Sequence, residues 1–398
     1  MKNEIKFVKN NLTGNFGKAD MQEYSLKVAR DVREYHKTIP DYEQTPLVSL
    51  KALSKEIGLK GLYVKDESKR FGLNAFKALG GSYAISKELS NRFEIKKLDF
   101  FEFLKPDVNE KVKQIHFMTA TDGNHGRGIA WFANKLGTKA QVFMPKGSSN
   151  ERLNNIKAEG ADARITEFNY DETVEYVNKL ASNDPNAAVF QDTAFLGYET
   201  IPKWIMQGYT TLALECMEQL KDITPTHIFL QAGVGAFAGS ATAFFRNVYG
   251  KSPIITIVEP NAADCIFKSF SAKDGKAHIV SGEMNSIMAG LCCGVPCSLA
   301  WDIIKEEADF CISCPDYIAE SGMRILAHPK GEDCAVISGE SGAVTTGLVY
   351  GLMTNPKLKD KKEELKLNSS SVVLCISTEG DTDKERYETI INGGKIKL

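Results

Sequence analysis

Residues 227–239 read HIFLQAGVGAFAG, a short apolar run that leads directly into a turn with three glycines. The run predicts a buried strand, and the small and apolar residues that follow predict a helix. Glycines in such a turn permit positive φ angles and let the backbone approach a bound group closely. The N–H groups at the start of the helix favour an anion, typically a phosphate. The stretch predicts a phosphate-binding turn, with a plain tight turn as the simpler alternative.

The same alternation of strand and helix patterns extends over most of the chain. Runs rich in β-branched and aromatic residues predict strands at 61–65, 115–118, 141–144, 187–190, 227–230, 254–258 and 371–376. Apolar residues recur every three or four positions between several of these runs, as helices require. The pattern predicts an α/β fold with mostly parallel sheets. Ligands in such folds bind outside the carboxyl ends of the strands, so the polar segments there are the candidate site.

Composition narrows the possible partners and the compartment. The chain of 398 residues has 49 Lys and Arg against 51 Asp and Glu, which argues against a nucleic acid or an anionic membrane as partner. Nine cysteines and a beginning without an apolar signal segment predict a reducing cytoplasm. We expect no metal site, because no cysteine and histidine spacing typical of zinc is present. Whether Cys265 pairs with Cys292 or Cys293 stays open.

A second segment, FGLNAFKALGGS at residues 71–82, places Lys77 between aromatic and small residues. We expect a helix to begin near Ala78. A lysine that is partly desolvated there holds its proton less tightly and becomes a usable amine, as a Schiff base requires. An ordinary surface lysine is the simpler interpretation of this segment on its own.

Three further polar segments follow predicted strands. In TATDGNHGRG, residues 119–128, Asp122 and Asn124 could hydrogen-bond a ligand, although Asn124 could equally cap the next helix. His125 in the same segment is more typical of a structural histidine than of a general base. Asp192 follows the strand at 187–190 as a capping residue or an active-site carboxylate. In ISTEGD, residues 376–381, hydroxyl groups could meet a ligand or cap a helix.

A different cofactor is compatible with the glycine-rich turn. Gly233, Gly235 and Ala238 match the dinucleotide-binding fingerprint, and Glu259 ends the next strand about twenty residues on. An NAD-dependent oxidoreductase is therefore the alternative. It leaves Lys77 and the Gly-Asn-His-Gly segment unexplained.

In this order along the chain, the segments resemble the fold-type II pyridoxal phosphate enzymes, the group of tryptophan synthase β and threonine deaminase. The resemblance covers about residues 43–383, most of the chain. It rests on Thr45-Pro-Leu, Leu62–Ser68, Phe76-Lys77, Gly123–Gly126, Gly233–Gly239, Glu340–Ala343 and Ile376–Thr378. Within the group, NAFKALGGSYA, TATDGNHGRG, FQDTAF, LCCGVPC and STEGDTD are most similar to the diaminopropionate ammonia-lyases.

The resemblance implies two parallel-sheet domains wrapped by helices, with pyridoxal 5′-phosphate in the cleft between them. The large domain would be 1–85 plus 205–398 and the small domain 86–204. Homodimers are typical of the family. The implied cofactor-binding residues are Lys77, which forms the Schiff base, Phe76, Asn124, Gly233, Val234, Gly235 and Gly239, with Ser377 or Thr378 facing the pyridine nitrogen.

The implied activity is α,β-elimination of D- and L-2,3-diaminopropionate to pyruvate and two molecules of ammonia. The alternative on the same scaffold is a threonine/serine ammonia-lyase, and a non-catalytic amino-acid or cofactor sensor is a third possibility. The family's substrate-binding residues would correspond to Thr121, Asp122 and His125. Its catalytic residues would correspond to Lys77, Asp122 and Asp192, with Asp122 acting on the D-isomer and Asp192 on the L-isomer.

Overall fold

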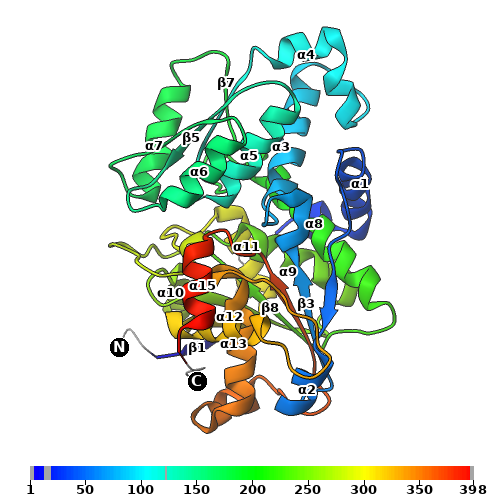
Figure 1. Cartoon of the computed structure of the whole chain (residues 1–398), viewed down its shortest axis with the longest axis vertical. Coiled ribbons are helices and arrows are strands. Elements are labelled where there is room, and N and C mark those ends of the chain that lie inside the picture. The colour runs from blue at the N-terminus through cyan, green and yellow to red at the C-terminus, as the bar shows by residue number, and fades with distance from the viewer. Residues whose placement is uncertain (1–3, 13–18, 122, 395–398) are drawn as a thin grey trace.

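The strands of the protein form two separate sheets, one in the lower and one in the upper half of Figure 1. The computed structural model describes residues 4–12, 19–121 and 123–394. The larger sheet has seven strands in the order β1-β10-β9-β8-β11-β3-β2, and the smaller has four in the order β6-β5-β4-β7. This arrangement confirms the predicted α/β class.

Among the strands of the described residues, most neighbours run parallel, and only β1 against β10 and β2 against β3 are antiparallel. The larger sheet consists of β1 (Lys6–Lys9), β2 (Leu47–Ser49), β3 (Gly61–Asp66), β8 (His227–Gln231), β9 (Ile254–Pro260), β10 (Phe310–Cys314) and β11 (Val372–Ser377). The smaller consists of β4 (His116–Ala120), β5 (Ala140–Met144), β6 (Asp162–Ile165) and β7 (Ala187–Val189). All seven predicted strands are confirmed; β1, β2, β6 and β10 were not predicted.

Helices cover both sheets (Figure 1). They are α1 (Leu26–His36), α2 (Lys51–Ile57), α3 (Ala78–Arg92), α4 (Pro106–Val112), α5 (Asn124–Lys135), α6 (Asn150–Ala158), α7 (Tyr170–Ala181), α8 (Thr200–Leu220), α9 (Ala236–Tyr249), α10 (Cys265–Ala272), α11 (Ser298–Glu307), α12 (Asp316–Ala327), α13 (Glu340–Thr354), α14 (Lys359–Glu364) and α15 (Lys384–Asn392). Short 3₁₀ helices are η1 (Met21–Tyr24), η2 (Glu67–Gly72), η3 (Phe100–Leu104), η4 (Ala289–Leu291) and η5 (Pro356–Leu358).

The predicted domain division places each sheet in a different part of the chain. The strands of the larger sheet fall within 1–85 and 205–398, and those of the smaller sheet fall within 86–204. The boundary positions themselves stay a prediction. Within the parts of the chain that the structure describes, no helix is long and apolar enough to cross a membrane.

Helices α3 and α8 connect the two sheets. Helix α3 packs on α5, which covers the smaller sheet, and on α8, which in turn packs on α9 of the larger sheet. The contact between α3 and α8 is close enough to require glycine. A Cβ atom on Gly208 would lie 2.5 Å from the carbonyl oxygen of Leu79 and 2.7 Å from the Cα of Gly80. This contact fixes the beginning of α3, where Lys77 lies.

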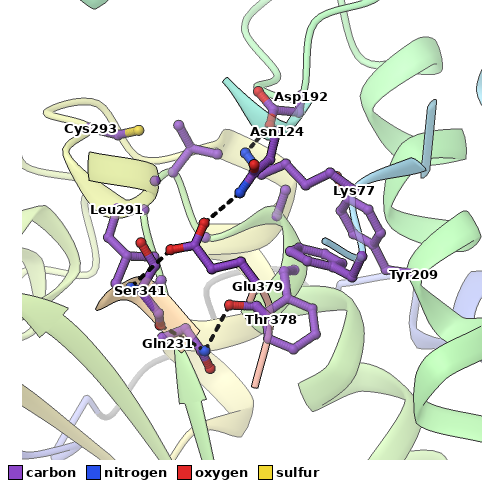
Figure 2. Close-up of a pocket in the computed structure, with 18 of the residues that line it drawn as sticks. Lys77, Asn124, Asp192, Tyr209, Gln231, Leu291, Cys293, Ser341, Thr378 and Glu379 are labelled. Carbon is purple, nitrogen blue, oxygen red and sulfur yellow. Dashed lines mark hydrogen bonds and ion pairs between the residues drawn. The ribbon is translucent and has the colours of Figure 1, made fainter. Parts of the chain in front are cut away.

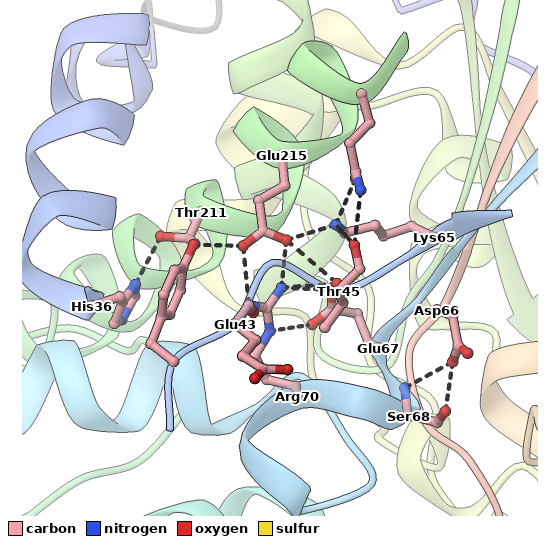
Figure 3. Close-up of polar contacts among 12 residues, drawn as sticks. His36, Glu43, Thr45, Lys65, Asp66, Glu67, Ser68, Arg70, Thr211 and Glu215 are labelled. Atoms are coloured by element: carbon pink, nitrogen blue, oxygen red, sulfur yellow. Dashed lines mark hydrogen bonds and ion pairs between the residues drawn. The ribbon is translucent and has the colours of Figure 1, made fainter. Parts of the chain in front are cut away.

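A buried ion-pair network lies where β3, η2 and α8 meet (Figure 3). Lys65 Nζ lies 2.6 Å from Glu215 Oε2, and Arg70 Nη2 lies 2.7 Å from the same oxygen. Arg70 also pairs with Glu67 at 2.8 Å. All four side chains are fully buried. Burial opposes ionisation of Glu215, but the charges of Arg70 and Lys65 hold the pKa of its carboxyl below the usual value. The network therefore holds the segment after β3, which leads to Lys77, against α8.

The contact between α3 and α8 predicts that Gly208→Ala destabilises the protein, although alanine is the better helix former. The added methyl meets backbone atoms, which cannot move aside. We expect a loss of about 1–3 kcal/mol in the free energy of unfolding, measured by denaturant titration. Gly81→Ala is the matched control, because its Cβ would meet only the tip of the flexible Ile129 side chain, at 2.9 Å. Equal stability of the two variants would contradict the prediction.

Candidate active site

A pocket lies at the carboxyl ends of strands from both sheets (Figure 2). Such ends are where α/β folds place ligands. The pocket residues come from segments far apart in the chain. They are Phe76, Lys77, Asn124, Tyr170, Asp192, Tyr209, Gln231–Phe237, Gly290, Leu291, Cys293, Ser341, Thr378 and Glu379.

Lys77 and Asp192 form an ion pair in this pocket. Lys77 lies immediately before α3, and its Nζ is 2.8 Å from Asp192 Oδ2. The other carboxylate oxygen of Asp192 accepts a hydrogen bond from the Tyr170 hydroxyl at 3.2 Å. Burial alone would raise the pKa of Asp192, but the charges of Lys77 and His125 and the hydrogen bonds hold it well below the usual value. Asp192 is therefore a carboxylate at neutral pH, and the structure brings together two of the predicted catalytic residues.

The glycine-rich turn connects β8 to α9 and lines the pocket with its backbone. Gly235, just before α9, has φ 94°, a conformation that favours glycine. A Cβ atom on Gly233 would lie 3.2 Å from the Gly290 carbonyl oxygen, so this position is also restricted to a very small residue. The first N–H groups of a helix lack partners within the helix. The turn therefore has the shape and the donors that an anionic group such as phosphate requires.

Gly239 differs from the rest of the predicted turn. It lies inside α9, and its N–H donates to the carbonyl oxygen of Gly235 at 2.7 Å. A Cβ atom there would lie 2.9 Å from the Cα of Ala300 in α11. Gly239 is not among the pocket residues. Its glycine serves the packing of α9 on α11, and the assignment of Gly239 to the phosphate-binding residues stays a prediction.

Thr378 and Ser377 at the end of β11 point in different directions. Thr378 lines the pocket, and its Oγ1 accepts a hydrogen bond from Gln231 Nε2 at 3.0 Å. Ser377 is fully buried and donates to Ser338 Oγ at 2.7 Å. Since successive side chains at a strand end face opposite sides, only one of the two hydroxyls reaches the pocket. That residue is Thr378.

The side chains of Asn124 and Glu379 are hydrogen-bonded to each other in the pocket (Figure 2). Asn124 is the first residue of α5, and its Nδ2 donates to Glu379 Oε2 at 2.5 Å. Sequence reasoning selected Asn124 but missed Glu379. It also missed Tyr170, Tyr209 and Cys293. The signal that could have identified Glu379 is its position directly after a strand, where Asp192 also lies.

Thr121 and His125 support the loop before α5 and do not line the pocket. Thr121 Oγ1 accepts hydrogen bonds from the N–H groups of Gly123 and Gly126, at 3.0 and 3.1 Å. His125 Nε2 is 2.7 Å from the carbonyl oxygen of Phe190. Both side chains are buried. These contacts give both side chains a structural role, and their assignment as substrate-binding residues stays a prediction. Asp122 lies outside the described residues.

Glu259 has a structural position that excludes the NAD alternative. Its carboxylate oxygens accept hydrogen bonds from the N–H groups of Ile266 and Phe267, at 2.9 and 2.7 Å, and so cap α10. The side chain is fully buried, and burial raises its pKa to about 8. A carboxyl group enclosed in this way cannot bind a ribose.

The remaining predicted features concern cysteines and metals. The Cys265 thiol lies 3.6 Å from Glu259 Oε1 and 3.9 Å from the carbonyl oxygen of Gly233, and it forms no disulfide. Within residues 4–12, 19–121 and 123–394, no group of three His, Cys, Asp or Glu side chains is arranged to hold a metal ion.

Known proteins show where this combination of fold and site occurs. The profile of the family described as "Pyridoxal-phosphate dependent enzyme" matches residues 39–378. The diaminopropionate ammonia-lyase of Salmonella typhimurium is 48% identical over 92% of this chain and 93% of its own length. That of Escherichia coli K12 is 47% identical over 94% and 93%.

Solved structures give the same result. Escherichia coli diaminopropionate ammonia lyase, in complex with an aminoacrylate-PLP azomethine reaction intermediate, superposes with a TM-score of 0.90 at 43% identity, covering 99% of this chain and 98% of that one. Threonine deaminase isoform 2 from Solanum lycopersicum has a TM-score of 0.73 at 18% identity over 98% of both chains, a likeness of fold alone. The chain belongs to the pyridoxal-phosphate-dependent enzymes of fold type II, and within them to the diaminopropionate ammonia-lyase family.

Proposed function

We propose that the protein catalyses the α,β-elimination of D- and L-2,3-diaminopropionate with pyridoxal 5′-phosphate as cofactor. With one molecule of water, the substrate yields pyruvate and two molecules of ammonia. The observation that carries the proposal is the pair of Lys77 and Asp192, 2.8 Å apart beside a phosphate-binding turn. The activities named for the relatives of known function support the choice of substrate.

The residues of the pocket fit the cofactor. Lys77 supplies the amine that binds its aldehyde, and the backbone of Gly233–Gly235 supplies donors for its phosphate. Phe76 lies in the pocket wall, with its ring centroid 4.7 Å from that of Tyr209 and 4.9 Å from that of Phe237. When bound, pyridoxal phosphate supplies an electron sink for the negative charge that develops at the substrate's α-carbon.

Thr378 suits the pyridine nitrogen of the cofactor. Because Gln231 Nε2 donates to its Oγ1, the hydroxyl proton of Thr378 is available to donate into the pocket. A neutral pyridine nitrogen accepts such a bond. A hydroxyl donor at this position leaves that nitrogen unprotonated, whereas a carboxylate would favour its protonation.

Asp192 is the proposed base for the α-proton of the L-isomer. Its low pKa keeps it ionised, and its contact with Lys77 places it beside the reacting amine. The α-proton of the D-isomer points to the opposite face, which one fixed base cannot serve equally well. For that isomer we propose Asp122, on the family resemblance. The carboxylates of the pocket also attract the second ammonium group, which leaves as ammonia.

The proposed enzyme is a cytoplasmic homodimer, as is typical of its family. Analytical ultracentrifugation measures the oligomeric state directly.

The role of Lys77 predicts that Lys77→Ala abolishes pyruvate formation while the protein stays folded. The loss follows because no other amine replaces the covalent link to the cofactor. Lys77→Arg is the matched control, because it keeps the positive charge beside Asp192 without a nucleophilic amine. We expect both variants to be inactive in a coupled lactate dehydrogenase assay. Near-normal activity of either variant with added cofactor would remove Lys77 from the chemistry.

The turn predicts a loss of cofactor binding in Gly235→Asp. This change adds a negative charge to the turn that is proposed to bind the phosphate. The new Cβ would lie 3.2 Å from Cδ1 of Ile266 and 3.4 Å from Cβ of Ala300, at a backbone conformation that favours glycine. Gly235→Ala separates the two effects, since it introduces the strain without the charge. We expect Gly235→Asp to bind pyridoxal phosphate at least about tenfold more weakly than Gly235→Ala, measured by absorbance titration of the apoprotein. Equal affinities would show that the turn does not hold the phosphate.

The two proposed bases predict opposite preferences for substrate handedness. Asp192→Asn keeps the size and the hydrogen bonding of the side chain but removes its basicity. We expect it to lower the rate with L-2,3-diaminopropionate by about 10²–10⁴-fold. Asp122→Asn is expected to do the same with the D-isomer. Steady-state kinetics with each pure enantiomer test this.

Equal, small losses for both isomers in both variants would refute the assignment and leave Lys77 as the base. Faster turnover of L-threonine or L-serine than of 2,3-diaminopropionate by the unmodified protein would favour the threonine/serine ammonia-lyase instead.

A further inference from the structure

Glu379 is a buried acid in the pocket to which the proposed reaction assigns no role. It follows Thr378 directly, and its side chain is among the pocket residues although the residue is only 1% exposed. A buried carboxylate is costly unless donors satisfy it. The donors that it has therefore indicate what the residue does.

The carboxylate of Glu379 links two helices, α13 and α5, which pack against different sheets. Its Oε1 accepts a hydrogen bond from the backbone N–H of Ser341 at 3.0 Å, in the first turn of α13. Its Oε2 accepts from Asn124 Nδ2 at 2.5 Å, at the start of α5. Figure 2 shows Glu379 between these two partners. A negative charge at the N-terminus of α13 is also favoured by the helix dipole.

The backbone around Glu379 leaves the side chain little freedom. A Cβ atom on Gly339 would lie 3.1 Å from Glu379 Cγ, and one on Gly342 would lie 2.8 Å from the Glu379 carbonyl oxygen. The same carbonyl accepts from the Gly339 N–H at 3.0 Å. The carboxylate is thus held in one place by small residues on one side and by two donors on the other.

A fixed carboxylate determines the orientation of the Asn124 amide. An ionised carboxylate only accepts hydrogen bonds, so the NH₂ group of Asn124 must face it and the amide oxygen must point away. One N–H of this NH₂ group is bound to Glu379, and the second is left to face another acceptor. A negatively charged acceptor requires a donor of this kind. The deprotonated hydroxyl group on the pyridine ring of pyridoxal phosphate is such an acceptor.

A second buried acid lies close to Glu379. Glu340, its neighbour at the start of α13, has a pKa raised to about 7 by its burial and by the negative charge of Glu379. The positive charges of Arg152 and Arg386 act in the opposite direction on Glu340.

We propose that Glu379 is a positioning residue. It turns the Asn124 amide so that this amide presents an N–H donor to the oxygen of the hydroxyl group on the cofactor's pyridine ring. The inference rests on the proposed function and on Asn124 as a cofactor-binding residue, which the family resemblance implies. It does not depend on which amino acid is the substrate.

The test is a double-mutant cycle of Glu379→Gln and Asn124→Ala, with pyridoxal phosphate affinity of the apoprotein as the readout. Glutamine has nearly the shape of glutamate but can donate as well as accept, so it no longer fixes the amide. We expect Glu379→Gln alone to weaken cofactor binding about tenfold and to shift the absorption band of the bound cofactor. In the Asn124→Ala background, the same change should have less than about a twofold effect, because its target is gone.

Two results would overturn the proposal. One is an unchanged affinity and spectrum in Glu379→Gln, and the other is an equal loss with and without Asn124. Glu340→Gln is the control for removing a nearby buried acid that does not line the pocket, and it should leave the affinity within about twofold.

Glu379→Asp serves as a second variant if Glu379→Gln fails to fold. Aspartate keeps the charge but is one methylene shorter, so it cannot reach both partners. Wild-type affinity in Glu379→Asp would equally contradict the proposal. Failure of the proposed reaction would be visible separately, as absent turnover of 2,3-diaminopropionate by an unmodified protein that still binds the cofactor.

Discussion

Four fully buried charges set the position of Lys77. Lys65, Glu67, Arg70 and Glu215 are fully buried, and each ion is stable there only because the others are present. Removal of any member of such a cluster leaves an uncompensated charge, at a cost of about 3–5 kcal/mol. The cluster therefore permits one relative placement of β3, η2 and α8 and excludes nearby alternatives.

The fixed placement of η2 and α8 also determines where two pocket residues lie. Arg70 lies in η2, a few residues before Lys77, and Glu215 lies on α8, the helix that also carries Tyr209 into the pocket wall. The glycine contact between α3 and α8 adds a second restraint on the same helix pair. Lys77 is thus attached to η2 and α3, which cannot move independently of α8. Such rigid mounting is what a preorganised catalytic group requires.

The fold class and the strands with long apolar runs could be predicted from the sequence. The same holds for charged residues and glycines in the turns next to such runs. Lys77, Asp192 and Gly233–Gly235 could be found because each follows or precedes such a run. The strands β1 and β2 are short edge strands, and β10 contains the polar Ser313, so local periodicity was too weak to mark them.

Other features of the site depend on partners that lie far away in the chain, which a local pattern does not show. Glu259 has the spacing of a ribose-binding acid, but its partners are the N–H groups at the start of α10. Gly239 has the spacing of a phosphate turn, but its neighbour is Ala300 in α11. The choice between Ser377 and Thr378 depends on which face of β11 is turned to the pocket. No local pattern contains that information.

The order of strands in the larger sheet also bears on how the chain is made. β11 lies between β8 and β3, and its Val372 aligns with Gly61, which comes more than three hundred residues earlier in the chain. The smaller sheet needs only residues between His116 and Val189. On a ribosome the smaller sheet can therefore pair while synthesis continues. The edge of β3 that pairs with β11 stays unpaired until the last strand emerges, although its other edge can already pair with β2. During that interval the exposed edges of β3 and β8 are the part of the nascent chain most open to wrong pairing, and most in need of a chaperone.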